Sequence, residues 1–396
     1  MTFSCEYIKG GLCITAAGNT SPCCATRGWS STIDKTSDIK SLVVNDTLLK
    51  MIDDESNGIV PKQCLGCIAI EERGGVSRRQ KLKAFKQYKT GKMNSGDIVN
   101  GKIIHMDISF GNTCNQKCIM CSSQFSSKWL QSDIKFNKHP LFRPINSGKA
   151  SQLRNWTLSY EQIDQIIDLV TSDTAVIELK GGEPFIDKRL SYFLEAATKK
   201  NPNIKFSITT NGTLIDESIL SILNNIKTVV NVSISLDGIN DLYTKIRGYE
   251  FNKFVPGFEI LLDRLDKRHR IHINPTLMKY NVDAIAEIYE WVGSKCKQYN
   301  RNVVLNFAQT VKGKGGINIE DATIEQITSG IDQLNYIKND PLKYSIDPFF
   351  QNTRIDIMIT LLESLKVVNA SLSMDDVKYR TACEEILLYA RDHGSD

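Results

Sequence analysis

Short apolar runs rich in β-branched residues alternate with amphipathic stretches between residues 102 and 310. The short runs predict buried strands, whereas apolar residues recurring at i, i+3, i+4 and i+7 predict helices. A capping box over residues 159–162 marks the start of the first of these helices. The expected strands are 103–110, 175–180, 205–210, 229–236, 271–277 and 303–307.

Six strand–helix alternations predict an α/β fold with a parallel sheet and right-handed crossovers. Six units are too few for the usual eight-stranded closed barrel. We therefore expect a partial (β/α)6 barrel that binds ligands near the carboxyl ends of its strands. Three parts are expected: a cysteine-rich segment with a basic connector over 1–100, the barrel over 101–320, and a mostly helical extension over 321–396.

Charge and hydropathy exclude several classes of protein. The 49 Lys and Arg residues nearly balance the 45 Asp and Glu residues, so the formal net charge is only +4. Such a balance predicts no strong attraction to nucleic acid or to a membrane. No apolar stretch approaches the ~18 residues that span a bilayer. The N-terminal residues also lack the pattern of an export signal, so we expect a cytoplasmic protein.

The connector over 76–100 carries a run of basic side chains. We interpret it as the solvated face of a helix, with a docking surface for an acidic partner as the alternative. Its basic residues are Arg78, Arg79, Lys81, Lys83, Lys86 and Lys89.

The chain has eleven cysteines, and their distribution is uneven. Disulfides rarely persist in a reducing compartment, so clustered thiols there indicate metal binding or redox chemistry. Cys296 and Cys383 stand alone and are expected to be small buried apolar residues. The others lie within the first 67 residues or together at 114–121.

Cys114, Cys118 and Cys121 follow the first expected strand with the spacing C-x3-C-x2-C. Three thiolates suit three irons of a [4Fe–4S] cube and leave the fourth iron open, unlike the four-cysteine sets of ferredoxins. Zinc is the alternative, but three thiolates without a nearby fourth ligand make a poor closed site.

This spacing resembles the signature of the radical S-adenosylmethionine superfamily, as do four further motifs at or after strand ends. They are Gly181-Gly182-Glu183-Pro184, Thr210-Asn211-Gly212, Ser233-Ile-Ser235-Leu-Asp237-Gly238 and Tyr243-Thr-Lys-Ile-Arg247-Gly248. The resemblance implies a [4Fe–4S] cluster on the three cysteines and S-adenosylmethionine as cofactor. It also implies reductive cleavage to a 5′-deoxyadenosyl radical, which takes a hydrogen atom from the substrate. Flavodoxin or ferredoxin is the expected electron donor.

The same resemblance implies roles for individual residues in cofactor binding. Gly181, Gly182 and Glu183 would hold the methionyl amino group, and Ser235 would contact the ribose. Arg247 would hold the carboxylate, for which a guanidinium fork is suited. Asn211 is also expected in the cofactor site. Met120 stands where the family usually has an aromatic residue and would pack on the adenine.

The N-terminal cysteines resemble the auxiliary-cluster domains called SPASM and, in shorter form, twitch. Cys5, Cys23, Cys64 and Cys67 would then be the ligands of a second, auxiliary [4Fe–4S] cluster. Cys24 is an alternative to Cys23, and Cys13 is expected to be a packing residue. A zinc ribbon is the alternative for the whole segment.

These resemblances favour an enzyme that modifies a peptide or protein side chain, because SPASM and twitch relatives often mature ribosomal peptides. An enzyme acting on a small metabolite, a sugar or a nucleotide is the alternative. A nucleic-acid modifier, supported only by two basic stretches, and a non-catalytic iron–sulfur protein are less favoured.

Overall fold

The computed structural model describes residues 3–26, 31–72, 77–80, 82, 96–136, 138–142, 155–307, 309–311, 315–339 and 348–393. These residues form two compact units. Unit 1 contains residues 1–112, 156–208 and 226–230, and unit 2 contains residues 113–155, 209–225 and 231–396. The expected parts over 1–100, 101–320 and 321–396 remain predictions. The expected lysines at 81, 83, 86 and 89 lie outside the described residues.

The sheet of unit 1 contains the parallel strands that the hydrophobic pattern predicts. Strand β4 (His105–Ile108) pairs in parallel with β5 (Val176–Leu179), and β5 pairs in parallel with β6 (Lys205–Thr210). The last two residues of β6 belong to unit 2. Alternate residues such as Ile177 and Leu179 are fully or almost fully buried, as expected for a sheet face covered by helices.

An N-terminal strand that contains Cys13 extends this sheet, and its pairing with the sheet is what the sequence analysis did not anticipate. Strand β1 (Gly11–Ile14) pairs in parallel with β4 and antiparallel with β2 (Asn19–Ser21), which pairs with β3 (Ser31–Thr32). The described residues of the cysteine-rich segment also include four α-helices. They are α1 (Glu6–Gly10), α2 (Ile39–Val43), α3 (Asp46–Ser56) and α4 (Leu65–Glu72).

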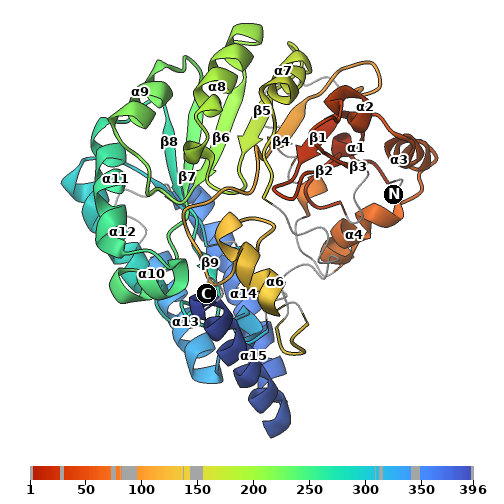
Figure 1. Cartoon of the computed structure of the whole chain (residues 1–396). Helices are drawn as coiled ribbons and strands as arrows, with labels where there is room; N and C mark the ends of the chain where they lie inside the picture. Colours follow the sequence, from red (N-terminus) through yellow and green to blue (C-terminus); the bar gives the residue numbers. More distant parts are fainter. Residues whose placement is uncertain are drawn as a thin grey trace. The chain divides into compact units, whose positions relative to one another are not determined.

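Helices α7 (Tyr160–Asp168) and α8 (Arg189–Lys200) follow β4 and β5 and lie beside each other (Figure 1). The predicted capping box is confirmed, because the Ser159 hydroxyl accepts from the Gln162 amide and the Gln162 side chain accepts from the Ser159 amide.

Unit 2 also contains parallel strands. Strand β8 (Arg270–Ile273) pairs in parallel with β7 (Val230–Ile234) and with β10 (Val304–Leu305), and the first residue of β7 belongs to unit 1. Helix α9 (Glu217–Asn225) precedes β7, α10 (Asn240–Arg247) and α11 (Phe251–Arg264) lie between β7 and β8, and α12 (Ile285–Gln298) lies between β8 and β10. The expected strand 271–277 is divided, because Pro275 cannot donate to a ladder. Its second part, β9 (Thr276–Leu277), pairs with β11 (Gln309–Thr310).

The C-terminal region is helical where it is described, as expected. It contains α13 (Ile324–Asn339), α14 (Pro348–Asn369) and α15 (Met374–His393). Among the described residues no single helix is long and apolar enough to cross a membrane. Two consecutive helical segments, Ile355–Asn369 and Met374–His393, together have the length and composition of a membrane span, but they are bent by 120° relative to each other.

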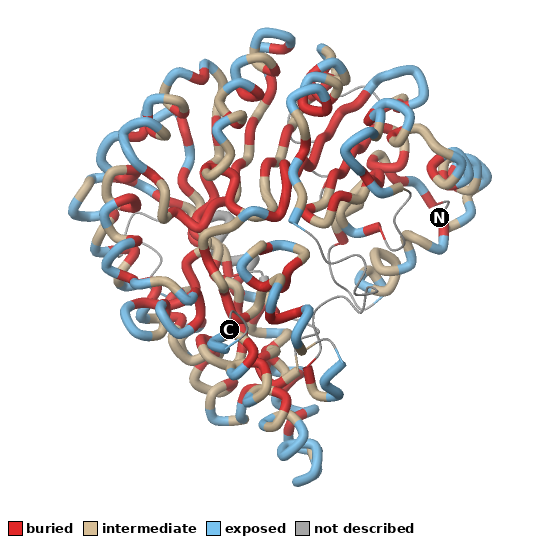
Figure 2. Tube along the Cα trace, viewed as in Figure 1, coloured by how far each residue is buried: buried red, intermediate tan, exposed pale blue. Residues whose placement is uncertain are grey.

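Buried residues concentrate in the strands and on the inner faces of the helices (Figure 2). Cys296 and Cys383 are both buried, which confirms the expectation that they are small apolar core residues. Cys13 lies in β1 and is also buried. The α/β class, with mostly parallel strands and a helical C-terminal region, is confirmed.

Candidate functional site

The three cysteines at 114–121 lie in an irregular segment after β4, residues 113–126, which we call the cysteine loop. Side chains satisfy much of its backbone. The Trp129 indole donates to the Cys118 carbonyl over 2.8 Å, and the Ser126 hydroxyl donates to the Gln116 carbonyl over 2.7 Å. Cys118 is buried, whereas Cys114 and Cys121 are half-buried. The loop is therefore held in one conformation by bonds that do not involve the thiols.

Polar hydrogens point toward two of the three sulfurs. The Gln116 amide donates to Cys114 Sγ over 3.5 Å, and Arg247 Nη1 donates to Cys118 Sγ over 3.7 Å. Burial raises the pKa of Cys118, and the charge of Arg247 opposes that rise. N–H donors around sulfur stabilise thiolates and the clusters that thiolates bind. The residues present therefore fit a cluster held by this loop.

The described residues contain no group of three or more His, Cys, Asp or Glu side chains that could hold a single metal ion. A [4Fe–4S] cube distributes its thiolates over different irons, so its ligands need not converge on one point. The ligand sets therefore remain predictions.

Asn211 is tied directly to the cysteine loop. Its side-chain amide donates to Asn115 Oδ1 over 2.8 Å, and its oxygen accepts from the Thr213 amide over 3.0 Å. Ser235 lies one residue past the end of β7, and its amide donates to the Thr210 carbonyl over 3.0 Å. Met120 packs against the core cluster that contains Ile119. Their expected contacts with the cofactor remain predictions.

Gly181, Gly182 and Glu183 follow β5 in unit 1. Gly181 and Gly182 have φ of +85° and +56°. A Cβ on Gly181 would also lie 2.3 Å from Ser109 Oγ, so this position requires glycine for the turn itself. Glu183 is buried, and its carboxylate accepts from the Phe185 amide over 3.1 Å.

The four N-terminal cysteines that the sequence analysis selects all line one pocket of unit 1. Cys5, Cys23, Cys64 and Cys67 come from segments up to 62 residues apart, and the pocket has a volume of about 20 Å³. Burial raises the pKa of Cys5 and of Cys64 to about 12. Four cysteines that line one space fit a cluster by their chemistry.

Cys23 lines this pocket and Cys24 does not. Burial raises the pKa of Cys24 to about 11, and the charges of Lys180 and Arg78 oppose that rise.

The two described arginines of the basic connector also lie in two different places. Arg79 lines the thiol pocket and pairs with Glu71, whereas Arg78 bonds to Glu178. Neither arginine lies on a solvated helix face, so that interpretation is wrong for these two residues.

A group of charged side chains, which we call the charged face, covers one side of β4 and β5. Asp107 and Glu178 lie opposite each other in register. Lys180 Nζ lies 2.6 Å from Asp107 Oδ2, and Arg78 Nη2 lies 3.0 Å from Glu178 Oε2. His105 Nε2 lies 3.2 Å from Glu178 Oε1. The sequence analysis missed this group, although two acidic residues inside otherwise apolar strands were a visible signal.

Asp107 is almost completely buried, yet its Oδ1 has no hydrogen-bond partner among the described residues. The same holds for Nε of Arg78. Unpaired buried polar atoms cost free energy, so they commonly mark a site for water or a ligand.

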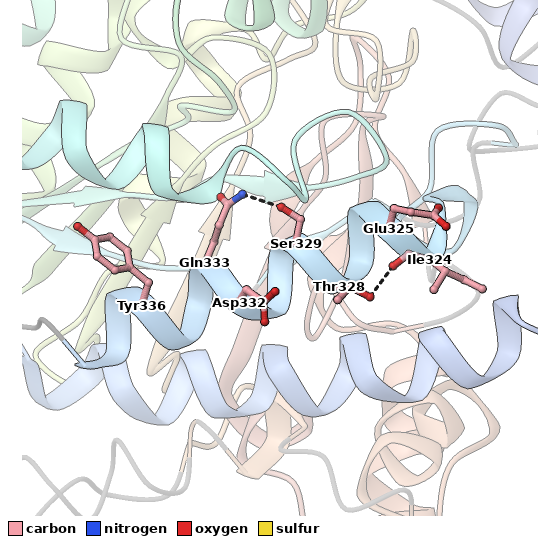
Figure 3. A pocket seen from close by; sticks show the side chains of 7 residues that line it. All are labelled: Ile324, Glu325, Thr328, Ser329, Asp332, Gln333 and Tyr336. Atoms are coloured by element: carbon pink, nitrogen blue, oxygen red, sulfur yellow. Dashed lines mark hydrogen bonds between the residues drawn. The ribbon is translucent and has the colours of Figure 1, made fainter.

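A larger hollow of about 720 Å³ lies along α13, between Ile324 and Tyr336 (Figure 3). Its lining is uncharged except for Glu325 and Asp332, and Gln333 donates to Ser329 over 3.0 Å beside it. None of the site residues expected from the sequence lines this hollow. The site residues expected from the sequence therefore lie outside this hollow.

Parallel strands, a cysteine loop after β4 and a glycine-rich turn after β5 define an α/β protein whose cysteine loop fits an iron–sulfur cluster by its chemistry. Residues 108–292, a little under half of the chain, match the Radical SAM superfamily, so the chain contains a radical SAM domain and is an enzyme.

Two relatives are named for different activities. A GTP 3′,8-cyclase of Campylobacter jejuni subsp. doylei is 24% identical over 250 residues, which are 62% of this chain and 68% of the relative. The antilisterial bacteriocin subtilosin biosynthesis protein AlbA of Bacillus subtilis is 26% identical over 147 residues, which are 37% of this chain and 27% of AlbA.

Two solved structures resemble parts of the chain. The structure of anSMEcpe with bound AdoMet has a TM-score of 0.43 at 19% identity, covering 61% of this chain and 63% of the other. Streptococcus suis SuiB bound to precursor peptide SuiA has a TM-score of 0.41 at 14% identity, covering 75% and 64%. The chain therefore spans less than two thirds of either protein.

We predict that Glu178→Gln destabilises the protein by about 1.5–3 kcal/mol at pH 7, because it removes a charged partner of Arg78. Burial alone would raise the pKa of Glu178, but the His105 hydrogen bond and the charge of Arg78 hold it well below its usual range. The stabilisation is therefore complete above about pH 5 and is lost as the pH falls below the unfolded-state pKa of about 4.3.

Urea unfolding of both proteins at pH 7 and near pH 3 measures the difference, which should shrink at the lower pH. Glu217→Gln is the matched control, since its ion pair with Arg264 is largely exposed and should contribute below about 1 kcal/mol. A Glu178 difference of equal size at both pH values would contradict the prediction.

Proposed function

We propose that this radical SAM enzyme modifies a peptide or protein side chain with the help of an auxiliary [4Fe–4S] cluster. The observation that carries the proposal is the shared pocket of Cys5, Cys23, Cys64 and Cys67. Four cysteines from distant segments line this pocket, and four cysteines are the ligand set expected from the resemblance to SPASM and twitch domains. The similarity to AlbA, a protein of bacteriocin biosynthesis, also supports a peptide substrate.

In this proposal Cys114, Cys118 and Cys121 hold the catalytic cluster, and Gly181, Gly182 and Glu183 bind the methionyl amino group. S-adenosylmethionine, once bound and reduced by one electron, supplies a 5′-deoxyadenosyl radical that takes a hydrogen atom from the substrate. The electron comes from a small carrier such as flavodoxin or ferredoxin, within a reducing cytoplasm.

The charged face is proposed to bind the substrate. Its two cations and two acids balance, so a neutral polar group fits it better than a net charge. The unpaired Asp107 Oδ1 accepts a hydrogen bond and the unpaired Arg78 Nε donates one. An amide carries the complementary donor and acceptor, and every peptide contains amides.

A nucleotide or another small metabolite is the second candidate, and the 24% identity to a GTP 3′,8-cyclase over 250 residues favours it. A nucleobase lactam has the same donor and acceptor as an amide. The two candidates therefore differ in which substrate increases cofactor cleavage, not in the residues that would bind it.

We predict that anaerobically reconstituted protein holds about eight irons, four in each cluster. Cys64→Ala should remove about half of them, because it removes a ligand of the auxiliary cluster, and Cys24→Ala should remove none. Iron analysis with EPR spectroscopy measures the content. Equal iron loss in both variants, or zinc in place of half the iron, would refute the auxiliary-cluster assignment.

The function is tested by supplying the reduced enzyme with short peptides encoded beside its gene, and separately with GTP. We expect a peptide to change mass and to accelerate 5′-deoxyadenosine formation. Cys64→Ala should still cleave S-adenosylmethionine slowly but should lose product formation, because cleavage requires only the catalytic cluster. Acceleration by GTP alone would favour the nucleotide candidate.

Asp107→Asn should weaken substrate binding about ten-fold, because it replaces the accepting oxygen or the partner of Lys180 by an amide. Cofactor cleavage without substrate should stay at the level of the unchanged protein. The apparent KM of the active substrate measures the effect, and Asp173→Asn on the loop before β5 is the control. An unchanged KM in Asp107→Asn would exclude the charged face as the substrate site.

A further inference from the structure

Helix α10 and the glycine after it contact four consecutive residues of the cysteine loop. Gln116 Nε2 donates to the Tyr243 hydroxyl over 3.2 Å, and the Ile119 amide donates to the Ile246 carbonyl over 2.8 Å. Gly248 adopts a left-handed conformation beside Lys117, where a Cβ would lie 3.1 Å from the Lys117 carbonyl. The conspicuous residues of the motif Tyr243-Thr-Lys-Ile-Arg247-Gly248 therefore face the loop that carries the thiols.

Arg247 completes this set of contacts. Its Nη1 lies 3.7 Å from Cys118 Sγ, and its Nη2 lies 2.6 Å from Asp237 Oδ2. The Arg247 side chain is 9% exposed and that of Asp237 is fully buried. The guanidinium is therefore enclosed between a buried carboxylate and the middle cysteine of the triad.

Asp237 is itself fixed from behind. Its Oδ1 accepts from the Thr276 amide over 2.6 Å, and its carbonyl accepts from Asn281 Nδ2 over 2.8 Å. A buried carboxylate anchored in this way orients the guanidinium and compensates its charge. Removing either partner leaves the other charge buried and unpaired, which strongly destabilises the folded protein.

We propose that Arg247 is a positioning residue for Cys118: the guanidinium, oriented by Asp237, donates to the cysteine sulfur and fixes the cysteine loop before iron or S-adenosylmethionine binds. The inference rests on the proposed function in so far as Cys118 is a cluster ligand. It differs from the role that the family resemblance implies for Arg247, which is to hold the cofactor carboxylate.

The first experiment uses iron-free protein, so that it does not depend on either cluster. Alkylation of Cys118 by iodoacetamide, followed by mass spectrometry over a range of pH, gives the rate constant of the deprotonated thiol, which reports how well the thiol is enclosed whatever its pKa. Arg247→Gln and Asp237→Asn should each accelerate alkylation about ten-fold. Arg247→Lys should lie between them and the unchanged protein, because it retains the charge but loses the fork.

Arg301→Gln is the matched control. Arg301 is a buried arginine of unit 2 that donates to the carbonyls of Leu265, Asp266 and His269, none of them in the cysteine loop. It should lower thermal stability without changing Cys118 alkylation. Thermal unfolding of all four variants separates a general loss of structure from a local opening of the loop.

The second experiment uses reconstituted protein and measures iron loss to a chelator, the reduction potential of the catalytic cluster and the affinity for S-adenosylmethionine. Arg247→Gln and Asp237→Asn should both accelerate iron loss, and Arg247→Gln should make the potential more negative by removing an N–H···S hydrogen bond. Unchanged alkylation and iron loss, with weaker cofactor binding in the Arg247 variants alone, would overturn the proposal. If the triad binds no cluster but alkylation still changes as expected, the proposed function fails while the positioning role stands.

Discussion

The cysteine loop must hold three thiols in place without a helix or strand of its own. Buried backbone groups in such a segment need partners from elsewhere, because an unpaired amide or carbonyl is costly. The loop obtains them from distant residues, including Trp129 at the Cys118 carbonyl and Asp133, whose carboxylate accepts from the Ser123 amide over 2.7 Å. Much of unit 2 can be understood as the support that this loop requires, and α10 contributes the part of it nearest to Cys118.

Unit 1 is organised by neighbouring residues that face two different environments. Cys23 and Arg79 line the thiol pocket, whereas Arg78 pairs with the acids of the charged face and shares that electrostatic environment with Cys24. Residues 23 and 24 are adjacent in the sequence, as are residues 78 and 79. Each pair therefore contributes one side chain to the thiol pocket and one to the surroundings of the charged face. The thiol pocket and the charged face are therefore joined directly by the backbone of residues 23–24 and 78–79, without any intervening element.

The periodicity of apolar residues predicts helices and strands that depend on residues close together in the sequence. It does not reveal how distant segments of the chain pair with each other. The strands after residue 102 and the Ser159 capping box are local patterns, and the structure contains them. Strand β1 is only four residues long, so its run of apolar residues does not reveal that it pairs with β4. Pro275 was a visible reason to divide the expected strand 271–277.

The candidate site is likewise only partly predictable from the sequence. The spacing of Cys114, Cys118 and Cys121 can be read from the sequence, whereas their hydrogen-bond donors cannot. Asp107 and Glu178 lie 71 residues apart and meet only because β4 and β5 pair in one register. The resemblance to a family suggested a ligand for Arg247, but a resemblance does not reveal the carboxylate of Asp237 that holds the guanidinium.

The C-terminal helices, whose role the sequence left open, belong to the same support. Leu387 and Ala390 of α15 lie in the core cluster with Ile119 and Trp129, against which Met120 and Cys121 also pack. Helix α15 contacts α6 (Leu130–Phe136), and Ser132 of α6 donates to the Ala390 carbonyl over 2.7 Å. The loop is thus enclosed by α10 through polar contacts and by α15 through apolar ones. The Arg247 contact specifies the direction of the Cys118 thiol, and burial of Cys118 keeps water from competing with that N–H···S bond.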